Sequence, residues 1–413
     1  MSTEPTEQQH RARTGRHGAG GRWAFLVAAY AFAVAMSGTT LLAPLYGLYQ
    51  KQLGFSDLMI TVIFAVYAAG VIAALLLFGR LSDGLGRRPV LLAGLVLAAL
   101  SAVCFLLEGG LPALFTGRVL SGLSAGLFTG TATVAVVELA PEPRRNAAML
   151  LATVANMGGL GSGPLLAGIL AQYAPQPLRL VFFVNLALVA VAVVGVLLIP
   201  ETVQAGQTVP LRPRRLRVPP AIRSTFVPAA AAGFAGFAML GLFTSVAPSF
   251  LHQVEGVDNL AASGAVVCAV FAASTAGQLL MPAFGVHRAL IWGCAVLAAG
   301  MAAIIASLAT SVLALLVLGA VVSGAGQGLS FRAGVTVVGE QSPPDQRAEV
   351  TSALFVVLYV AISIPVVGVG ALAVVAGLRS AGLVFSACVA LLAGATALRL
   401  LLRPAGEAET GAG

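Results

Sequence analysis

Charged side chains are scarce in this sequence. Only 9% of its 413 residues are Asp, Glu, Lys or Arg, whereas 59% are hydrophobic. A soluble protein cannot cover its surface with so little charge. The hydrophobic residues also form continuous runs and do not alternate with polar ones, which argues against a transmembrane β-barrel. The sequence therefore indicates an all-α integral membrane protein.

Twelve hydrophobic runs are long enough to cross a membrane. About 20 apolar residues in a helix span the hydrocarbon core of a bilayer. The predicted spans are 24–49, 57–78, 89–107, 111–137, 146–170, 179–199, 226–250, 260–282, 289–309, 312–338, 348–372 and 380–402. We therefore expect twelve transmembrane helices in a multi-pass protein.

Lysine is almost absent, since Lys51 is the single lysine beside 22 arginines. The net charge of +8 reflects arginines that gather in alternate loops, whereas the loops between them carry few. This distribution follows the positive-inside rule and places both termini in the cytoplasm. It gives no indication of a nucleic-acid partner. The clustered arginines are Arg11, Arg13, Arg16, Arg22, Arg80, Arg87, Arg88, Arg144, Arg145, Arg212, Arg214, Arg215, Arg217, Arg399 and Arg403.

Cysteine and histidine, which often act in catalysis or bind metals, are also scarce in this sequence. The four cysteines lie inside predicted spans with no metal-binding spacing, and the four histidines lie in tails and loops. The sequence contains no HExxH motif and no phosphate-binding loop. We therefore expect no metal, no cofactor and no enzymatic activity, and no direct use of ATP.

The spans divide into two groups of six. Residues 200–225 are rich in proline and arginine and predict a cytoplasmic linker between bundles at 23–199 and 226–402. Residues 1–22 and 403–413 are the predicted cytoplasmic tails.

An internal repeat supports this division. With an offset of 202 residues, GRVLSGLSAG at 117–126 meets GAVVSGAGQG at 319–328, and Glu138 meets Glu340. A duplicated six-helix unit predicts two pseudo-symmetric bundles that bind a ligand between them and rock around it.

One loop concentrates charge: GRLSDGLGRRP at 79–89. Its counterpart in the second half, 277–290, keeps an arginine but lacks the acid. Membrane orientation requires only the arginines, so it does not explain the presence of Asp83. We expect Asp83 to accept hydrogen bonds from backbone N–H groups at a helix N-terminus and to pair with an arginine. Such a latch would hold one face shut and break when the bundles rock. Its predicted members are Gly79, Asp83, Gly86, Arg87 and Arg88.

This loop resembles the loop 2–3 signature of the major facilitator superfamily. Gly84 stands where that signature has a basic residue. The twelve spans, the repeat and the linker resemble the family fold over residues 23–402. The resemblance implies a transporter that works by alternating access.

Two further stretches resemble the drug:proton antiporter branch. Arg118, Gly122 and Gly126 resemble a fourth-helix motif whose arginine is implicated in proton translocation. An alternative is that Arg118 extends toward the nearer end of its span. The stretch GLGSGPLLAG at 159–168 resembles the antiporter motif of exporters, although its glycines would also suit ordinary helix packing. The matching residues in this stretch are Gly159, Gly163, Pro164 and Gly168.

No acid lies in the middle of a span, because all fifteen lie in tails, loops or span ends. Proton coupling then needs another titrating group, since arginine keeps its proton. The predicted coupling candidates are Arg118 and Glu138, and without such a group the protein would be a uniporter. Candidates for the substrate cavity are Tyr46, Asn156, Asn185, Gln278 and Gln327. So few charges favour an apolar, neutral or weakly cationic substrate over a multiply charged one.

These observations predict an exporter of small organic compounds in a bacterial cell membrane, coupled to protons and acting as a monomer. The alternative within transport is an importer or facilitator of a sugar, amino acid or other metabolite. A transporter-like sensor or a membrane enzyme is a more remote alternative. The partners expected are a small-molecule substrate, lipid and protons.

Overall fold

The structure is a computed structural model that describes residues 23–79, 81–107, 109–203, 216–253 and 256–402. The described residues are about 90% helical and contain no strand. Twelve of their helical stretches are long and apolar enough to cross a membrane. The predicted tails at 1–22 and 403–413, and most of the linker, lie outside the described residues.

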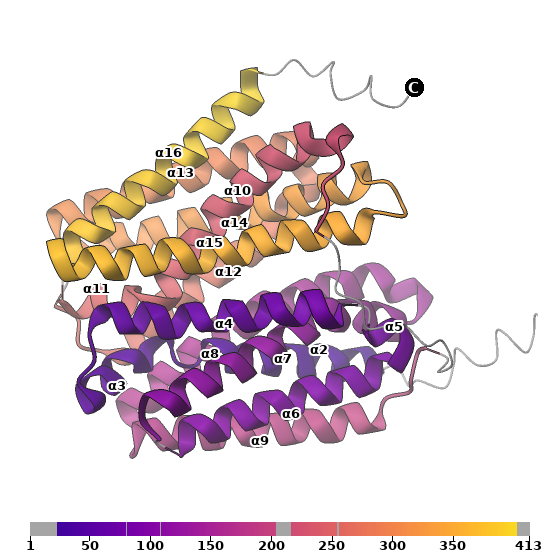
Figure 1. The fold of residues 1–413 in the computed structure, drawn as a ribbon, viewed down its shortest axis with the longest axis horizontal. Helices are drawn as coiled ribbons and strands as arrows, with labels where there is room; N and C mark the ends of the chain where they lie inside the picture. Colours follow the sequence, from indigo (N-terminus) through magenta and orange to yellow (C-terminus); the bar gives the residue numbers. More distant parts are fainter. Residues whose placement is uncertain (1–22, 80, 108, 204–215, 254–255, 403–413) are drawn as a thin grey trace, which may run out of the picture.

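The first six-helix bundle runs from α2 to α9, and the second runs from α10 to α16 (Figure 1). The first contains α2 (Ala24–Thr40), α3 (Tyr46–Leu53), α4 (Asp57–Phe78), α5 (Leu81–Leu85), α6 (Arg87–Leu106), α7 (Gly110–Leu139), α8 (Arg145–Tyr173) and α9 (Pro177–Leu198). The second contains α10 (Arg223–Ser245), α11 (Ala247–Gln253), α12 (Leu260–Phe284), α13 (Val286–Thr310), α14 (Leu313–Gln341), α15 (Arg347–Ala376) and α16 (Leu378–Leu402). The short helices α3, α5 and α11 lie at the ends of the bundles.

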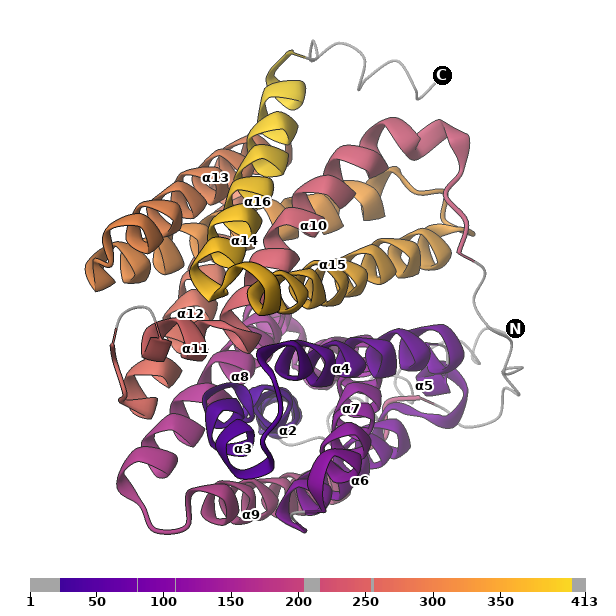
Figure 2. The ribbon, with the colours of Figure 1, turned by 60° about the vertical axis from the view of Figure 1, so that its left-hand side comes forward.

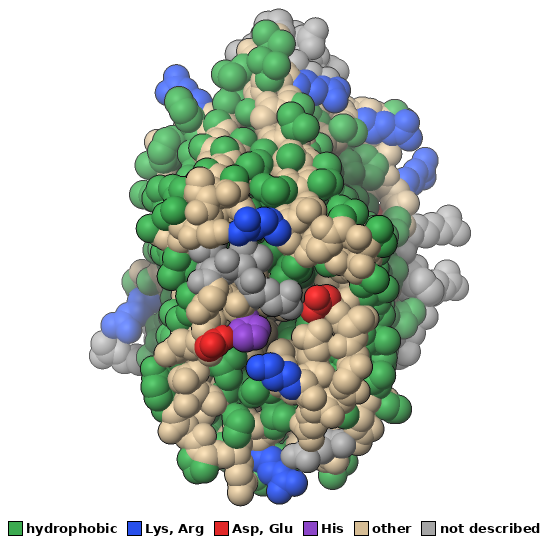
Figure 3. Space-filling model, turned by 90° about the vertical axis from the view of Figure 1, so that its left-hand side faces the viewer, with side chains coloured by type: hydrophobic (Ala, Val, Ile, Leu, Met, Phe, Trp, Pro, Cys, Tyr) green, Lys and Arg blue, Asp and Glu red, His purple; other side chains and the backbone are tan. Residues whose placement is uncertain are grey.

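The two ends of the molecule differ. We call the end where α2 begins and α16 finishes the linker end, because the connection between the bundles also lies there (Figure 1). The opposite end, which carries α3 and α11, is the far end. Seen from the far end, the face shows many hydrophobic side chains and only a few charged ones (Figure 3).

The first helix of each bundle is broken near the far end. The sequence predicts one span at 24–49, but α2 ends at Thr40 and a short 3-10 helix at Ala43–Leu45 precedes α3. The predicted span at 226–250 divides in the same way into α10 and α11. Pro44 and Pro248 explain both breaks, since proline has no N–H to continue the helical ladder.

Glycines bring the helices within each bundle into backbone contact. A methyl group added at Gly122 would lie 2.2 Å from the carbonyl oxygen of Tyr67 on α4. One added at Gly163 would lie 2.3 Å from the carbonyl oxygen of Ser37 on α2. Small residues are favoured at such helix contacts in membranes, where dispersion replaces the hydrophobic effect as the driving force.

The bundles meet through α8 against α12 and through α4 against α15. Near the far end, a methyl group at Gly168 would lie 2.4 Å from the carbonyl oxygen of Leu260. The backbone N–H of Leu260 also donates to Gln172 Oε1 at 2.8 Å. Across the second pair, a methyl group at Gly370 would lie 2.2 Å from Thr61 Oγ1. The far end is thus closed by direct contact between the bundles.

The same face of α8 changes from buried to exposed along its length. Gly161, Pro164 and Gly168 are buried toward the far end, whereas Val154 and Leu150 are 42% and 44% exposed toward the linker end. These residues recur at intervals of three, four or seven and therefore lie on one stripe of the helix. Figure 2 shows the helices of the two bundles diverging in this direction. The bundles therefore separate at the linker end.

Cysteine labelling tests this separation. In a variant without Cys104, Cys268, Cys294 and Cys388, we expect Val154→Cys to react with a charged maleimide at least about tenfold faster than Ala167→Cys, because reaction requires access of water to the thiol. Ala167 is fully buried on the same helix and serves as the matched control. The measurement is the labelling rate of the purified protein. Equal rates at the two positions would contradict the separation of the bundles.

Candidate functional site

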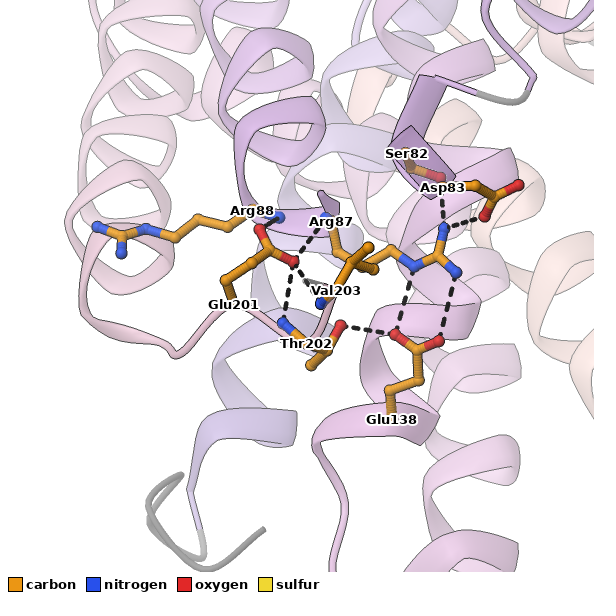
Figure 4. A network of polar contacts seen from close by, with 8 residues as sticks. All are labelled: Ser82, Asp83, Arg87, Arg88, Glu138, Glu201, Thr202 and Val203. Atoms are coloured by element: carbon orange, nitrogen blue, oxygen red, sulfur yellow. Dashed lines mark hydrogen bonds and ion pairs between the residues drawn. The ribbon is translucent and has the colours of Figure 1, made fainter. Parts of the chain in front are cut away.

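Arg87 organises a polar network at the linker end (Figure 4). Its NH1 group donates to Ser82 Oγ at 2.7 Å and to Asp83 Oδ1 at 2.6 Å. On its other side, Nε and NH2 each donate to the carboxylate of Glu138 at 3.3 Å. The side chain of Arg87 is only 13% exposed, whereas those of Asp83 and Glu138 are 57% and 36% exposed, so water screens both ion pairs in part.

Glu201 caps the N-terminus of α6. Its carboxylate accepts hydrogen bonds from the backbone N–H groups of Arg87 at 2.8 Å and Arg88 at 3.0 Å. A carboxylate here satisfies unpaired N–H groups and complements the positive end of the helix dipole. Gly86 permits this approach, because its φ is +102° and a methyl group there would lie 2.5 Å from Glu201 Oε2.

The backbone hydrogen bonds that we expected of Asp83 are therefore made by Glu201. Asp83 pairs with Arg87, as expected, and its side chain remains 57% exposed. The sequence analysis did not select Glu201, although an acid directly after Pro200 marks the end of the sixth predicted span. Thr202 completes the connection by donating from Oγ1 to Glu138 at 2.6 Å.

All the partners drawn in Figure 4 belong to the first bundle or to the segment that follows it. The network joins α5, the start of α6 and the end of α7 to residues 201–203. Gly79 lies directly after α4, at the entrance to this loop. In this conformation the network stabilises one bundle from within, while the two bundles are apart at this end.

Arg118 is buried inside the first bundle, with an exposed fraction of 2%. Its NH1 group donates to the carbonyl oxygen of Thr39 at 2.7 Å. Its guanidinium carbon lies 5.1 Å from the ring centre of Tyr67, 5.4 Å from that of Phe64 and 5.9 Å from that of Tyr46. The side chain therefore points into the protein and does not extend to the end of its span.

Two effects stabilise this buried cation without an acid. Thr39 lies in the last turn of α2, where carbonyl groups carry the negative end of the helix dipole. The three aromatic rings add cation–π attraction, which strengthens when the cation is removed from water. The break after α2 thus creates the acceptor, and α3 and α4 supply the rings.

An aromatic cluster of the second bundle lies opposite this site. The side chains of Tyr67 and Tyr359 lie close together across the bundle interface. Phe237 lies 6.2 Å from Tyr359 and 5.3 Å from Phe331 between ring centres, and Phe331 lies 6.4 Å from Phe355. We call Phe237, Phe331, Phe355 and Tyr359 the aromatic cluster. The sequence analysis missed it, because its members come from three helices and follow no local pattern.

The polar residues predicted to line a cavity lie in different places. Gln278 and Gln327 are buried in the second bundle, where Ser274 Oγ donates to Gln327 Oε1 at 2.6 Å and accepts from Gln278 Nε2 at 3.3 Å. Asn156 is half-buried on α8. Asn185 lines a cavity inside the first bundle with room for about one water molecule.

The prolines of α8 and α12 leave carbonyl groups that other helices satisfy. Pro164 cannot donate to the carbonyl of Leu160, which accepts instead from Thr40 Oγ1 at 2.9 Å. On α12, Pro282 frees the carbonyl of Gln278. Arg332 NH1 donates to that oxygen at 2.8 Å, which explains the position of this half-buried arginine.

The predicted glycines of α8 lie at its helix contacts. Gly159 and Gly163 pack α8 closely against α2, whereas Gly168 packs it closely against α12.

Two six-helix bundles that are closed at one end and separated at the other define a membrane transporter. The family model of the Major Facilitator Superfamily matches residues 28–310. This match covers more than half of the sequence, and the chain belongs to that family.

Curated relatives and solved structures agree with this assignment. Proteins of Salmonella newport and Salmonella typhimurium that are named multidrug resistance protein MdtD are 29% identical over 174 residues. This match covers 42% of the chain but only 36% of the relatives' own length. A D-xylose–proton symporter has the same fold, with a TM-score of 0.72 at 15% identity over 92% of this chain and 96% of its own. A POT family transporter gives 0.73 at 14% identity, over 92% of this chain and 95% of its own.

The role of Glu201 can be tested by stability. Replacing the cap in Glu201→Gln removes the charge that faces the helix N-terminus, and we expect a loss of about 1 kcal/mol. The measurement is the melting temperature of the detergent-solubilised protein, which should fall by a few degrees. Glu142→Gln is the matched control, since Glu142 is 82% exposed. An equal effect of both substitutions would contradict the capping role.

Proposed function

We propose that this transporter exports small organic compounds across a bacterial cell membrane by alternating access and is coupled to protons. The observation that carries the proposal is the position of the glycine-proline stretch of α8. It contacts α2 of its own bundle and α12 of the other, and so forms the surface on which one bundle moves against the other. The resemblance of this stretch to the motif of exporters and the multidrug resistance names of the relatives support export.

The orientation follows from the charge pattern. Arg87, Arg88, Arg144 and Arg145 all lie at the linker end. By the positive-inside rule, this pattern supports a cytoplasmic position for the linker end and for both termini. With this orientation the structure is open toward the cytoplasm, which is the state in which an exporter loads its substrate. Each chain carries both bundles, and we propose that it works as a monomer.

Glu138 is the candidate for proton binding at this end. Its carboxylate accepts from Arg87 and from Thr202, and its side chain is 36% exposed to the solvent side of the network. Protonation would weaken both contacts, because they depend on the negative charge. Loosening the network would change how the cytoplasmic end closes. Arg118 would then hold the first bundle together near the binding region without exchanging a proton itself.

Accumulation of dyes and antibiotics tests the proposal. In a pump-deficient bacterium we expect the protein to lower accumulation, and we expect a protonophore or Arg118→Ala to restore it, because the buried guanidinium holds α2, α3, α4 and α7 together. Arg145→Gln is the control for loss of an arginine on the surface. Higher accumulation of any compound would show uptake and contradict export.

Asp83→Asn tests the linker-end network during transport. The substitution removes one of the two charges that hold Arg87, so we expect the transport rate to fall by more than the amount of protein in the membrane. The measurement combines initial efflux rates with quantification of the protein in isolated membranes. Transport at the wild-type rate would show that the Asp83–Arg87 pair has no part in the cycle.

A further inference from the structure

Two buried hydrogen-bond donors near Arg118 have no acceptor. Arg118 Nε and the hydroxyl of Tyr46 are both enclosed by protein and make no hydrogen bond with any residue that the structure describes. They belong to one cluster, because the guanidinium carbon lies 5.9 Å from the ring centre of Tyr46. Buried polar groups are nearly always paired, so two unpaired donors in one cluster indicate that an acceptor from outside the chain completes the site.

The cluster also carries an uncompensated charge. Arg118 is the single charged residue among the buried side chains of the described residues. The sequence places no acid in the middle of a span, and Arg332, which also lies inside a span, has the same positive charge as Arg118. A buried charge without a partner is costly, and attraction to a single anion offsets that cost. The missing acceptor should therefore be an anion.

The position of the cluster gives it access to the space between the bundles. Tyr67, one of the rings around Arg118, contacts Tyr359 across the interface. Behind Tyr359 lies the rest of the aromatic cluster, with Phe331 and Phe355 half-buried. A ligand that parts Tyr67 from Tyr359 would meet a cation on one side and aromatic rings on the other.

We propose that Arg118 and Tyr46 bind the carboxylate of an aromatic monocarboxylic acid, and that its ring packs on the aromatic cluster. The planar guanidinium suits a carboxylate, because its Nε and NH2 groups can donate two parallel hydrogen bonds to the two carboxylate oxygens. One negative charge balances the one positive charge of Arg118. The rings on both sides favour an aromatic body over an aliphatic one, through stacked and edge-on contacts.

This inference names the substrate class for the proposed export and rests on that function only for the direction of movement. It also accounts for the absence of an acid in the spans. The substrate itself supplies the negative charge near Arg118, so the protein does not need a carboxylate there. The inference reverses the expectation of a neutral or weakly cationic substrate.

A matched pair of probes tests the site. In purified protein in lipid nanodiscs, tritiated 2-naphthoate is displaced by unlabelled 2-naphthoate or by 2-naphthamide, which has the same ring but no charge. We expect the carboxylate to bind at least about tenfold more tightly than the amide, as a charge-assisted contact in a dry site requires. Arg118→Gln should abolish this preference, and Tyr46→Phe should reduce it while leaving the amide unaffected. Arg145→Gln, at the linker end, should keep it.

Each other outcome overturns the proposal. Equal affinity for the two probes, or no binding of 2-naphthoate to the wild-type protein, would show that the site does not take a carboxylate. Loss of the preference in Arg332→Gln but not in Tyr46→Phe would place the anion at the other arginine. If Arg118→Gln does not fold, Tyr46→Phe still decides, since it removes one hydroxyl only. Binding to purified protein requires neither export nor a proton gradient, so its failure is distinct from failure of the proposed function.

Discussion

The rest of the structure depends on one constraint, which is that backbone carbonyls inside a membrane need a hydrogen-bond donor from the protein itself. Prolines in the spans remove N–H groups and so create carbonyls without a partner. Thr40 donates to one such carbonyl on α8, and Arg332 donates to another on α12. Arg118 donates in the same way to Thr39, at the broken end of α2. In each case the donor lies on a different helix, so the bent helices are also held together.

Glycine determines where the helices approach closely, and the same helix serves both bundles. Gly159 and Gly163 fit α8 against α2, while Gly168 fits it against α12. In the alternating access that we propose, contacts within a bundle would persist, whereas contacts between bundles would break and form again. A smooth face without large side chains allows this exchange, because few interlocking groups need to rearrange. The polar network around Arg87 joins α5, α6 and α7 at the end where the bundles are apart.

The positive charges of the two arginine sites are stabilised in different ways. Arg87 is surrounded by carboxylates, with Asp83 and Glu138 on its side chain and Glu201 on its backbone N–H. Arg118 contacts a carbonyl and three rings, and no carboxylate of the described residues pairs with it. The carboxylates around Arg87 suit a network of ion pairs that can form and break in contact with water. The surroundings of Arg118 leave attraction available for a ligand in a site that excludes water.

The sequence by itself determined the membrane class, the twelve spans and the two-fold repeat, because hydropathy and internal similarity are properties of the chain read in order. It also identified Arg118, Asp83 and the glycine-proline stretch, since a charge or a proline inside a span is conspicuous. It did not reveal that the first and seventh spans are broken, that Glu201 and not Asp83 caps α6, or that four aromatic residues gather opposite Tyr67. Only the tertiary structure decided these points. Glu201 and Arg87 are hydrogen-bonded although they are 114 positions apart in the sequence, and Arg118 and Thr39 are 79 positions apart. Local sequence patterns do not indicate which distant side chain will pair with a given hydrogen-bonding group.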